Sequence, residues 1–220
     1  MRKILLIIFT FCISNSFAQI YDFDNFKELF KKVESPFVID SCSIQDLVAQ
    51  ASKFSRIDKD MKKYIPDNLY EDLFKEQSVR AYFNIPISDK FISLMIFAGS
   101  FEDDFIVTNS TFYLVNYDVE GNVIDYIKVA GYIFESGHSW CTINNKNIMY
   151  NSFETYKMPV SFKYDENRVI PMIENRYKYS IDSNGNFSKE ILFNRKGLYE
   201  PTYDGCVFEF CGDFPKGEKH

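Results

Sequence analysis

The chain has 220 residues, a formal net charge of −6 and 46% hydrophobic residues, with 23 Phe and 15 Tyr against a single Trp. The acidic balance disfavours nucleic acid and anionic membranes as partners, because both would repel the chain at long range. The length is enough for one sizeable core, and Phe and Tyr suit the half-buried surfaces of β-sheets. These features favour a single globular domain rich in β-structure.

The first eighteen residues have the pattern of an export signal. Arg2 and Lys3 provide a positive start, and residues 4–13 are apolar and uncharged. Ser16 and Ala18 then place small side chains at the two positions that a signal peptidase recognises, with cleavage expected before Gln19. The apolar stretch is too short to span a bilayer, which takes about 20 residues. We therefore predict an exported chain, periplasmic or extracellular, with no membrane span after cleavage. Loss of Arg2 and Lys3 takes its net charge from −6 to −8.

The predicted organisation is a signal peptide at 1–18 followed by one domain at 19–220. Within that domain we expect residues 19–76 to be mostly helical, 77–214 to be mostly β-structure and 215–220 to be a flexible tail. The predicted class is α+β and mainly β: short N-terminal helices followed by an antiparallel, hairpin-rich sheet, either a sandwich or a meander.

Two helices are predicted near the start of the domain. Apolar residues from Phe26 to Val33 recur at helical spacing after Asp24, a plausible N-cap, and Ser35-Pro36 ends the segment. Ser43 to Asp46 is close to a capping box and predicts a second helix that buries Leu47, Val48 and Ala51.

The next part of the chain predicts a linker and a third helix. Residues 56–63 include six charged side chains, which we interpret as a solvated linker or exposed turn. From Asp67 on, apolar residues return to helical spacing as far as Phe74.

From about Val79 onward the apolar pattern has the period of strands. Residues 82–87 and 91–97 predict a hairpin, in which Pro86 favours an edge position for the first strand and the continuous apolar run favours a covered, central position for the second. Further strands are predicted at 105–117, 123–134, 147–154, 161–164, 176–181, 187–193 and 206–210.

One sequence pattern occurs twice. Residues 113–123 and 177–187 match at their Tyr, Asp, Gly and Asn positions, and each predicts a strand, an Asp-x-x-Gly-Asn turn and a second strand. Asp can hydrogen-bond the backbone ahead of it, and Gly supplies the positive φ that closes the turn. The second copy also resembles a calcium loop, but Gly185 and Phe193 occupy the wrong positions for an EF-hand. We therefore interpret both copies as hairpin turns.

Four cysteines remain after signal cleavage, because Cys12 leaves with the signal: Cys42, Cys141, Cys206 and Cys211. An even number in an exported chain indicates disulfides, with three possible connectivities. Residues 206–211 read as a strand whose ends would lie about 16 Å apart, too far for a bridge. Unless a turn interrupts that strand, each of its cysteines pairs with Cys42 or Cys141 or stays free.

The segment His138-Ser139-Trp140-Cys141 is the densest chemical cluster. A zinc site with Cys206 and Cys211 is conceivable but matches no familiar ligand spacing, so we predict no metal and no cofactor. A triad based on His138 is disfavoured, because adjacent strand residues point to opposite faces. Paired carboxylates occur at 71–72, at 103–104 and in Asp22 with Asp24, but a glycosidase needs two acids at a set separation across a cleft, which closeness in sequence does not provide. The acids at 102–104 read as a solvated loop between strands.

Tyr126, Tyr132, Trp140 and His138 are the candidate ligand-binding residues, since Tyr and Trp could form a sugar or peptide platform with Phe134. The same residues alternate as strand core residues do. The sequence therefore predicts a non-enzymatic exported domain that binds a protein or a glycan, with an inhibitor or an immunity-type module as examples of this class. The alternative is an exported hydrolase whose carboxylates come together only in the fold.

Overall fold

The structure is a computed structural model and describes residues 22–70, 78–102, 106–133, 137–156, 169–203 and 206–213. The predicted signal peptide at 1–18, the tail at 215–220, the strand at 161–164 and the acidic pairs at 71–72 and 103–104 lie outside these residues.

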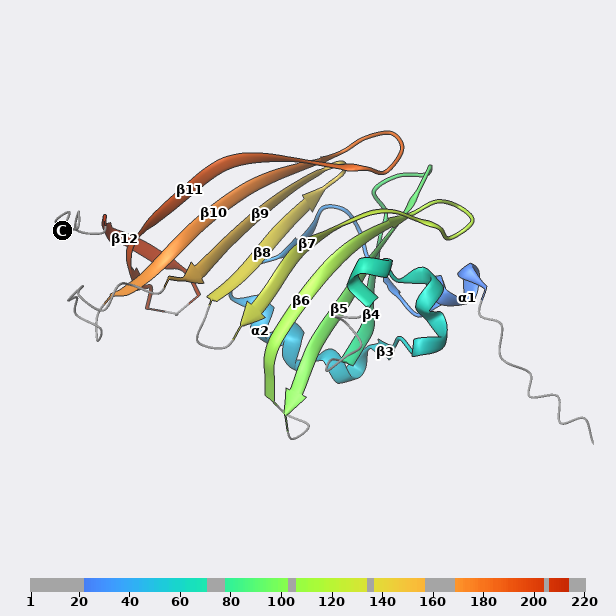
Figure 1. Cartoon of the computed structure of the whole chain (residues 1–220), viewed down its shortest axis with the longest axis horizontal. Coiled ribbons are helices and arrows are strands. Elements are labelled where there is room, and N and C mark those ends of the chain that lie inside the picture. Colours follow the sequence, from blue (N-terminus) through green and yellow to red (C-terminus); the bar gives the residue numbers. More distant parts are fainter. Residues whose placement is uncertain are drawn as a thin grey trace, which may run out of the picture.

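The strands form one open, mixed sheet of 12 strands (Figure 1). From β4 to β12 each strand pairs antiparallel with the next, so this part is a meander of hairpins. The prediction of a mainly β, hairpin-rich chain is confirmed, but the sheet is not wholly antiparallel, because β1 lies parallel to β4. The strands are β1 Lys31–Lys32, β2 Phe37–Ile39, β3 Ser55–Arg56, β4 Ser78–Ile85, β5 Ile92–Glu102, β6 Ile106–Tyr117, β7 Val123–Ile133, β8 Gly137–Asn144, β9 Asn147–Thr155, β10 Ile170–Ile181, β11 Phe187–Pro201 and β12 Phe208–Gly212.

The described helices are few and short. They are α1 Phe23–Glu28, α2 Ser43–Ala49 and the 3₁₀ helices η1 Ala51–Lys53 and η2 Lys59–Tyr64, and a further helical turn occupies 67–70. The N-cap of α1 is Asp22, whose Oδ1 accepts from the Asn25 N–H at 2.8 Å, and not Asp24 as expected. The first helix also ends earlier than its apolar spacing predicts, because Lys31 and Lys32 pair with β4.

The charged stretch at 56–63 is not the solvated linker that its composition predicts. Ile57 and Met61 are buried in the core, and η2 occupies most of the stretch. The charged side chains around them stay exposed, so two apolar residues among six charged ones are enough to dock the segment.

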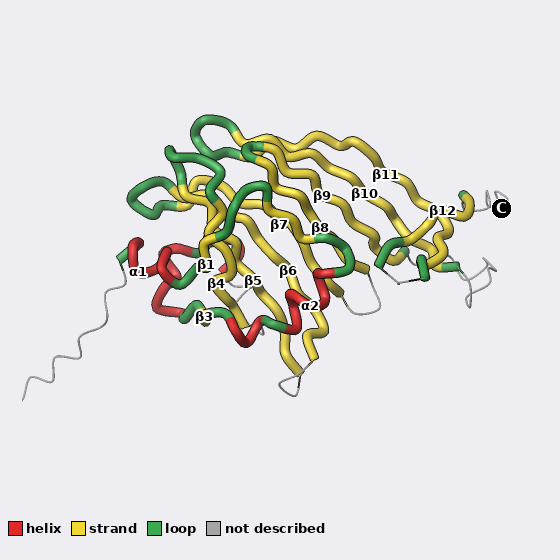
Figure 2. Tube along the Cα trace, turned by 180° about the vertical axis from the view of Figure 1, so that it is seen from behind, coloured by secondary structure: helices red, strands yellow, loops and turns green. Residues whose placement is uncertain are grey.

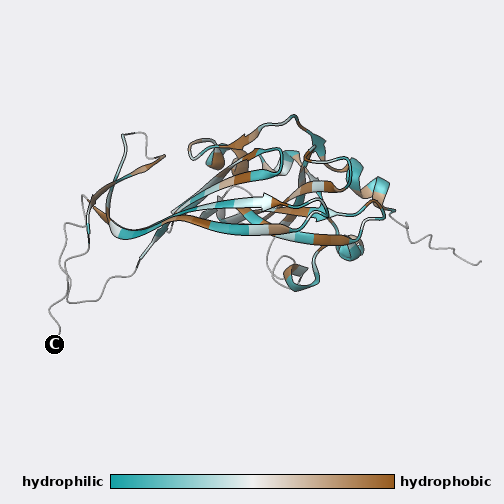
Figure 3. Ribbon diagram, turned by 90° about the horizontal axis from the view of Figure 1, so that it is seen from above, coloured by the Kyte–Doolittle hydropathy of each residue, from teal (hydrophilic) through white to brown (hydrophobic). Residues whose placement is uncertain are grey.

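Helical segments cover both faces of β4, β5 and β6. In Figure 1, η2 crosses the front of these strands, whereas α2 lies behind them and comes to the front in Figure 2. Met61 and Tyr64 of η2 pack with Leu94 and Ile96 of β5, and α2 residues join the core on the other face, to which Phe97 belongs. Seen from above, the helical segments gather at one end of a long, curved sheet (Figure 3). The prediction that residues 91–97 form a central, doubly covered strand is confirmed.

The two Asp-x-x-Gly-Asn copies form matching turns, one between β6 and β7 and the other between β10 and β11. In both, the aspartate carboxylate accepts from the backbone N–H and the side-chain amide of the asparagine four residues later, at 2.8–3.1 Å. Gly121 and Gly185 have φ of +91° and +94°, which only glycine adopts without strain. The turn hydrogen bonds hold the pKa of Asp118 and Asp182 below the ordinary value.

The turn between β10 and β11 is fastened to the first half of the sheet. The Asn116 side chain donates to the Gly185 carbonyl at 2.7 Å, and the Phe187 N–H donates to Asp125 Oδ2 at 2.8 Å. Asn116 is buried and also accepts from Ser93 Oγ at 2.7 Å. These bonds join strands that are far apart in the order of the sheet.

Candidate binding site

A row of small polar side chains crosses strands β8 to β11. Ser139 lies opposite Ser152, Ser152 opposite Asn175, and Asn175 opposite Asn194. Residues directly opposite in a ladder share a face of the sheet, so these four residues, which we call the polar row, line up on one face. They come from four different strands and are brought together only by the register of the sheet.

Three members of the polar row form a directional chain of hydrogen bonds. The Asn194 amide donates to Asn175 Oδ1 at 2.5 Å, and the Asn175 amide donates to Ser152 Oγ at 3.3 Å. Ser152 Oγ in turn donates to Glu154 Oε1 at 3.4 Å. Each of these donors is therefore used within the protein.

Ser139, the fourth member, is the exception. It is only 3% exposed, and its Oγ has no hydrogen-bond partner of acceptable distance and angle among the described residues. Burial raises the pKa of the nearby Tyr150 hydroxyl to about 12, and hydrogen-bonding interactions with Ser139 and Ser152 act against that rise. The Ser139–Tyr150 contact does not meet the distance and angle of an ordinary hydrogen bond, so it leaves Ser139 Oγ unsatisfied. A buried hydroxyl without a hydrogen bond is uncommon and calls for a physical reason.

Ser139 lies in the lining of a pocket of about 300 Å³. We call it the polar pocket; its lining also includes Gly131, Ser152, Glu154 and Lys128. The pocket is within the size range of small-ligand sites. The Ser139 side chain therefore borders the pocket, while its Oγ is itself buried.

Gly131 makes room for Lys128 beside Ser139. Gly131 lies directly opposite Ser139, and a Cβ at this glycine would be 3.3 Å from Lys128 Cε and 3.6 Å from Nζ. The Lys128 side chain thus lies across the glycine, toward the strand that carries Ser139. The same Cβ would be 2.8 Å from the Ser110 carbonyl oxygen, so a side chain at 131 would also clash with the neighbouring strand.

Lys128 and Glu154 give the polar pocket balanced charge. Burial lowers the pKa of the half-buried Lys128 ammonium, and the Glu154 carboxylate acts in the opposite direction. One positive and one negative side chain therefore border a pocket whose other polar groups are neutral.

Tyrosines border the polar row on the side of Ser152 away from Glu154. Tyr150 and Tyr177 stack with ring centroids 5.7 Å apart, and Lys189 Nζ lies 3.5 Å from the Tyr177 ring centroid. Burial raises the pKa of Tyr177 and Tyr179. The polar row thus lies between an aromatic group on one side and Glu154 on the other.

The four sequence candidates do not come together. Tyr126 packs partly against the core beneath η2, and Tyr132 packs against the core beneath α2. His138 and Trp140 do meet, with ring centroids 5.4 Å apart, in a third cluster that contains Phe153. His138 also borders the polar pocket.

His138 serves the fold near the C-terminal end. Its Nε2 lies 2.9 Å from the Cys206 carbonyl oxygen, and burial lowers its pKa. The ring is therefore neutral near pH 7 and donates from Nε2 to that carbonyl. This contact supports the loop that enters β12.

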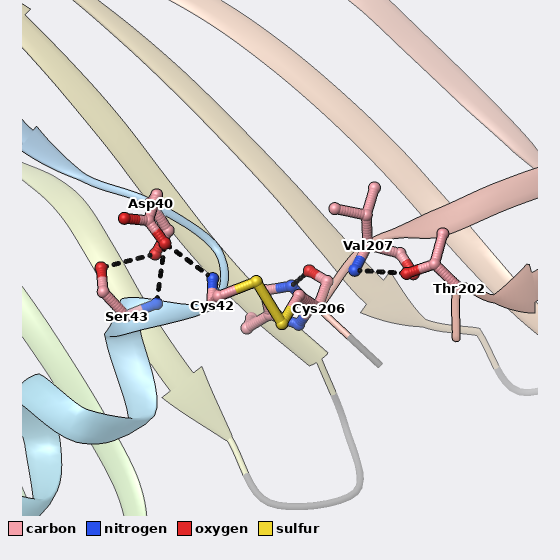
Figure 4. The surroundings of a disulfide bond; sticks show 7 residues. Asp40, Cys42, Ser43, Thr202, Cys206 and Val207 are labelled. Carbon is pink, nitrogen blue, oxygen red and sulfur yellow. Dashed lines mark hydrogen bonds between the residues drawn. A yellow bond between two sulfur atoms is a disulfide. The ribbon is translucent and has the colours of Figure 1, made fainter. Parts of the chain in front are cut away.

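Of the four disulfide candidates, Cys42 and Cys206 form a bridge, with Cα atoms 4.8 Å apart (Figure 4). Cys141 and Cys211 are free. Burial raises the pKa of the Cys141 thiol to about 12, so it is unreactive, whereas Cys211 is exposed on β12. The bridge joins residues 164 apart in sequence and ties the start of α2 to the segment that precedes β12.

Asp40 accepts hydrogen bonds from the backbone at the first cysteine of this bridge. Its Oδ1 accepts from the N–H groups of Cys42 and Ser43 at 3.0 and 2.8 Å (Figure 4). These bonds hold the pKa of Asp40 below the ordinary carboxyl value. The start of α2 is thus supported by Asp40, and not by the capping box that the sequence predicts at Ser43.

The described carboxyl groups with a shifted pKa belong to turns and to a helix start. The carboxyl groups with shifted pKa are Asp40, Asp118 and Asp182, and in each the shift arises from hydrogen bonds of a turn or helix start. No group of three or more His, Cys, Asp or Glu side chains that could hold a metal ion occurs among the described residues. Within the same residues, no helix has the length and apolar character needed to cross a bilayer.

A larger pocket of about 740 Å³ lies between α1 and the hairpin of β4 and β5. Its acidic residues Asp24 and Glu28 are exposed, and Asp24 already pairs with Lys27 at 2.7 Å. Its lining holds no buried polar side chain that lacks a partner. The polar pocket is therefore the stronger candidate.

Sequence reasoning missed the polar row and its strand β8. The apolar positions of β8 are interrupted by small polar residues, so residues 137–144 lack a clear alternating pattern. Ser139, Ser152, Asn175 and Asn194 are ordinary residues in sequence, and nothing but the register shows that they align. The pairing of Gly131 with the buried Ser139 could have pointed to this site, but it becomes visible only when the strand register is known.

Comparison with known proteins gives no relative for this chain. No family model, curated protein or solved structure matches it.

Proposed function

We propose that this protein is an exported, non-catalytic binding domain and that the polar pocket holds a sugar ring of a neutral glycan. The observation that carries the proposal is the buried Ser139 Oγ without a hydrogen bond. Leaving such a group unpaired costs about 1–3 kcal/mol. A ligand hydroxyl in the pocket would supply the missing partner and recover that free energy on binding.

The chemistry of the polar pocket suits a neutral, hydroxyl-rich ligand. Lys128 and Glu154 offset each other, so neither an anion nor a cation is strongly favoured. Hydroxyl and amide side chains both donate and accept, which matches the hydroxyls of a sugar. A net charge of −6 for the whole chain further disfavours acidic polymers.

Binding is better supported than hydrolysis. A glycosidase ordinarily needs two carboxylates, one on each side of the bond that is cleaved. Glu154 is the single acidic residue in the described lining of the polar pocket.

The experiment is a calorimetric titration of the chain from residue 19 onward with a panel of neutral oligosaccharides. We expect at least one to bind and Ser139→Ala to weaken that binding about tenfold, since one hydrogen bond is lost. Ser93→Ala is the matched control: it removes a buried serine hydroxyl that is already bonded to Asn116, away from the pocket.

Two results would contradict the proposal. One is a result in two parts: no neutral oligosaccharide binds, and a protein captured from the extracytoplasmic fraction binds the parent and the Ser139→Ala variant equally well. The other is the appearance of shortened products or new reducing ends, read by mass spectrometry, which would favour the hydrolase.

A further inference from the structure

The outer edge of β11 is open over most of its length. One edge of β11 pairs with β10 from Phe187 to Tyr199, whereas β12 pairs with the other edge only at 198–201. Among the described residues, no strand is bonded to that second edge over 187–197. Unpaired backbone N–H and C=O groups along an edge are a template for another strand.

The basic side chains of this edge do not protect it. Edge strands are commonly guarded by charged residues that project past the backbone. Here Lys189 lies 3.5 Å from the Tyr177 ring centroid, Lys196 lies 4.8 Å from that of Tyr156, and the Arg195 guanidinium lies 4.2 Å from that of Phe210. All three cations therefore pack on rings of their own sheet.

Two large apolar side chains are exposed at the middle of the open edge. Ile191 is 66% exposed and Leu192 is 45% exposed. The register shifts here: Ile191 faces Tyr177 and Phe193 faces Arg176, so Leu192 is an extra residue with no partner on β10. The bulge thus presents adjacent apolar residues where the edge is unpaired.

We infer that β11 pairs antiparallel with β11 of a second copy of this chain, about a two-fold axis between Ile191 and Leu192. This register places each Ile191 opposite Leu192 of the second copy. The two-fold axis makes two such pairs, so the exposed apolar residues of both copies are covered. It brings no like charges directly opposite one another. Among the diagonal pairs, Glu190 with Arg195 of the second copy is favourable, whereas Lys189 with Lys196 of the second copy is a like-charge pair whose two ammonium groups instead pack on tyrosine rings of their own sheet.

Sedimentation velocity over the micromolar range tests this pairing. We expect the parent chain to dimerise and Ile191→Lys to be monomeric, because the lysine would face an apolar residue at the axis. Val119→Lys is the matched control, since Val119 is 65% exposed in the turn between β6 and β7 and its change should leave the dimer intact. A monomeric parent, or a dimer that survives Ile191→Lys, overturns the inference.

A charge exchange tests the register. Glu190→Arg would bring two arginines together across the axis, so we expect the dissociation constant of the dimer to rise several-fold. Adding Arg195→Glu to this variant should restore the parent dissociation constant, because an arginine and a glutamate again form the diagonal pair. If Arg195 only stabilised the fold, the second change would not restore the affinity. Failure of the double variant to recover affinity contradicts this register. The dimer does not depend on the proposed glycan site, so either can fail alone.

Discussion

Strands β4 to β6 and strands β8 to β11 belong to one sheet but are built in different ways. The first group is covered by helical segments on both faces, and its side chains are buried on both. The second group carries a row of serine and asparagine side chains across one face, with an unpartnered hydroxyl at one end. The contrast indicates that packing determines the residues of the first region, whereas the second retains polar residues that packing does not need.

Truncation of a core ring in the first region is expected to have the largest effect. Phe112 is fully buried on β6 between Tyr82 and Phe97. Phe112→Ala should lower the free energy of unfolding by about 3–5 kcal/mol. Tyr177→Ala, on the half-exposed face of β10, should cost clearly less. Urea denaturation of both variants compares the regions, and equal losses would contradict the contrast.

Loss of the disulfide comes next, because it ties the start of α2, which packs on the first region, to the segment that precedes β12. The double variant Cys42→Ser, Cys206→Ser removes a bond between residues 164 apart in sequence. It should lower the free energy of unfolding by about 2–5 kcal/mol. Cys141→Ala with Cys211→Ala leaves the bridge in place and serves as the control. If reductant shifts the urea midpoint of the parent no more than that of the bridge-less variant, the bridge does not contribute this stability.

The two matching turns differ in the room left beside their glycines. A Cβ at Gly121 would lie 2.5 Å from Phe23 Cγ, whereas one at Gly185 would lie 3.0 Å from the flexible end of Ile124. Both glycines have positive φ, so both alanine variants are strained. We expect Gly121→Ala to cost about 2–3 kcal/mol and Gly185→Ala about 1–2 kcal/mol. The reverse order in thermal unfolding would mean that the turns pack differently.

A smaller effect should appear with pH at His138. Its pKa is lowered in the folded state, so the unfolded state binds the proton more readily. Stability from this group is therefore complete above about pH 6.5 and declines as pH falls below it. Denaturation at pH 7 and pH 5.5 should show a loss that His138→Gln reduces. An identical loss in that variant would assign the dependence to other groups.

The fold was more predictable from sequence than the site. Continuous apolar runs and the two Asp-x-x-Gly-Asn turns depend on local chemistry, and they correctly predicted β5 and two hairpins. The helices were overestimated because Lys31 and Lys32 join β4, a contact with residues about fifty positions away. The polar row depends on the register of four strands, which no local pattern encodes.

The candidate residues show the same division. The sequence predicts that Tyr126 and Tyr132 share an aromatic binding platform, yet they pack into different cores. His138 and Trp140 do meet, because they lie two apart on one strand and share a face. Pairing Cys42 with Cys206 required the fold, since three connectivities were open.

The central claim is that the Ser139 hydroxyl serves a ligand and not the fold. The direct measurement is the free energy of unfolding of Ser139→Ala and Ser93→Ala, each with and without a neutral oligosaccharide that binds the parent. Ser139→Ala should be as stable as the parent or more stable, and should lose most of the stabilisation by the sugar. Ser93→Ala should lose about 1–3 kcal/mol, since Asn116 is left unpaired, but keep that stabilisation. A marked loss of stability in Ser139→Ala with unchanged stabilisation by the sugar would contradict the account.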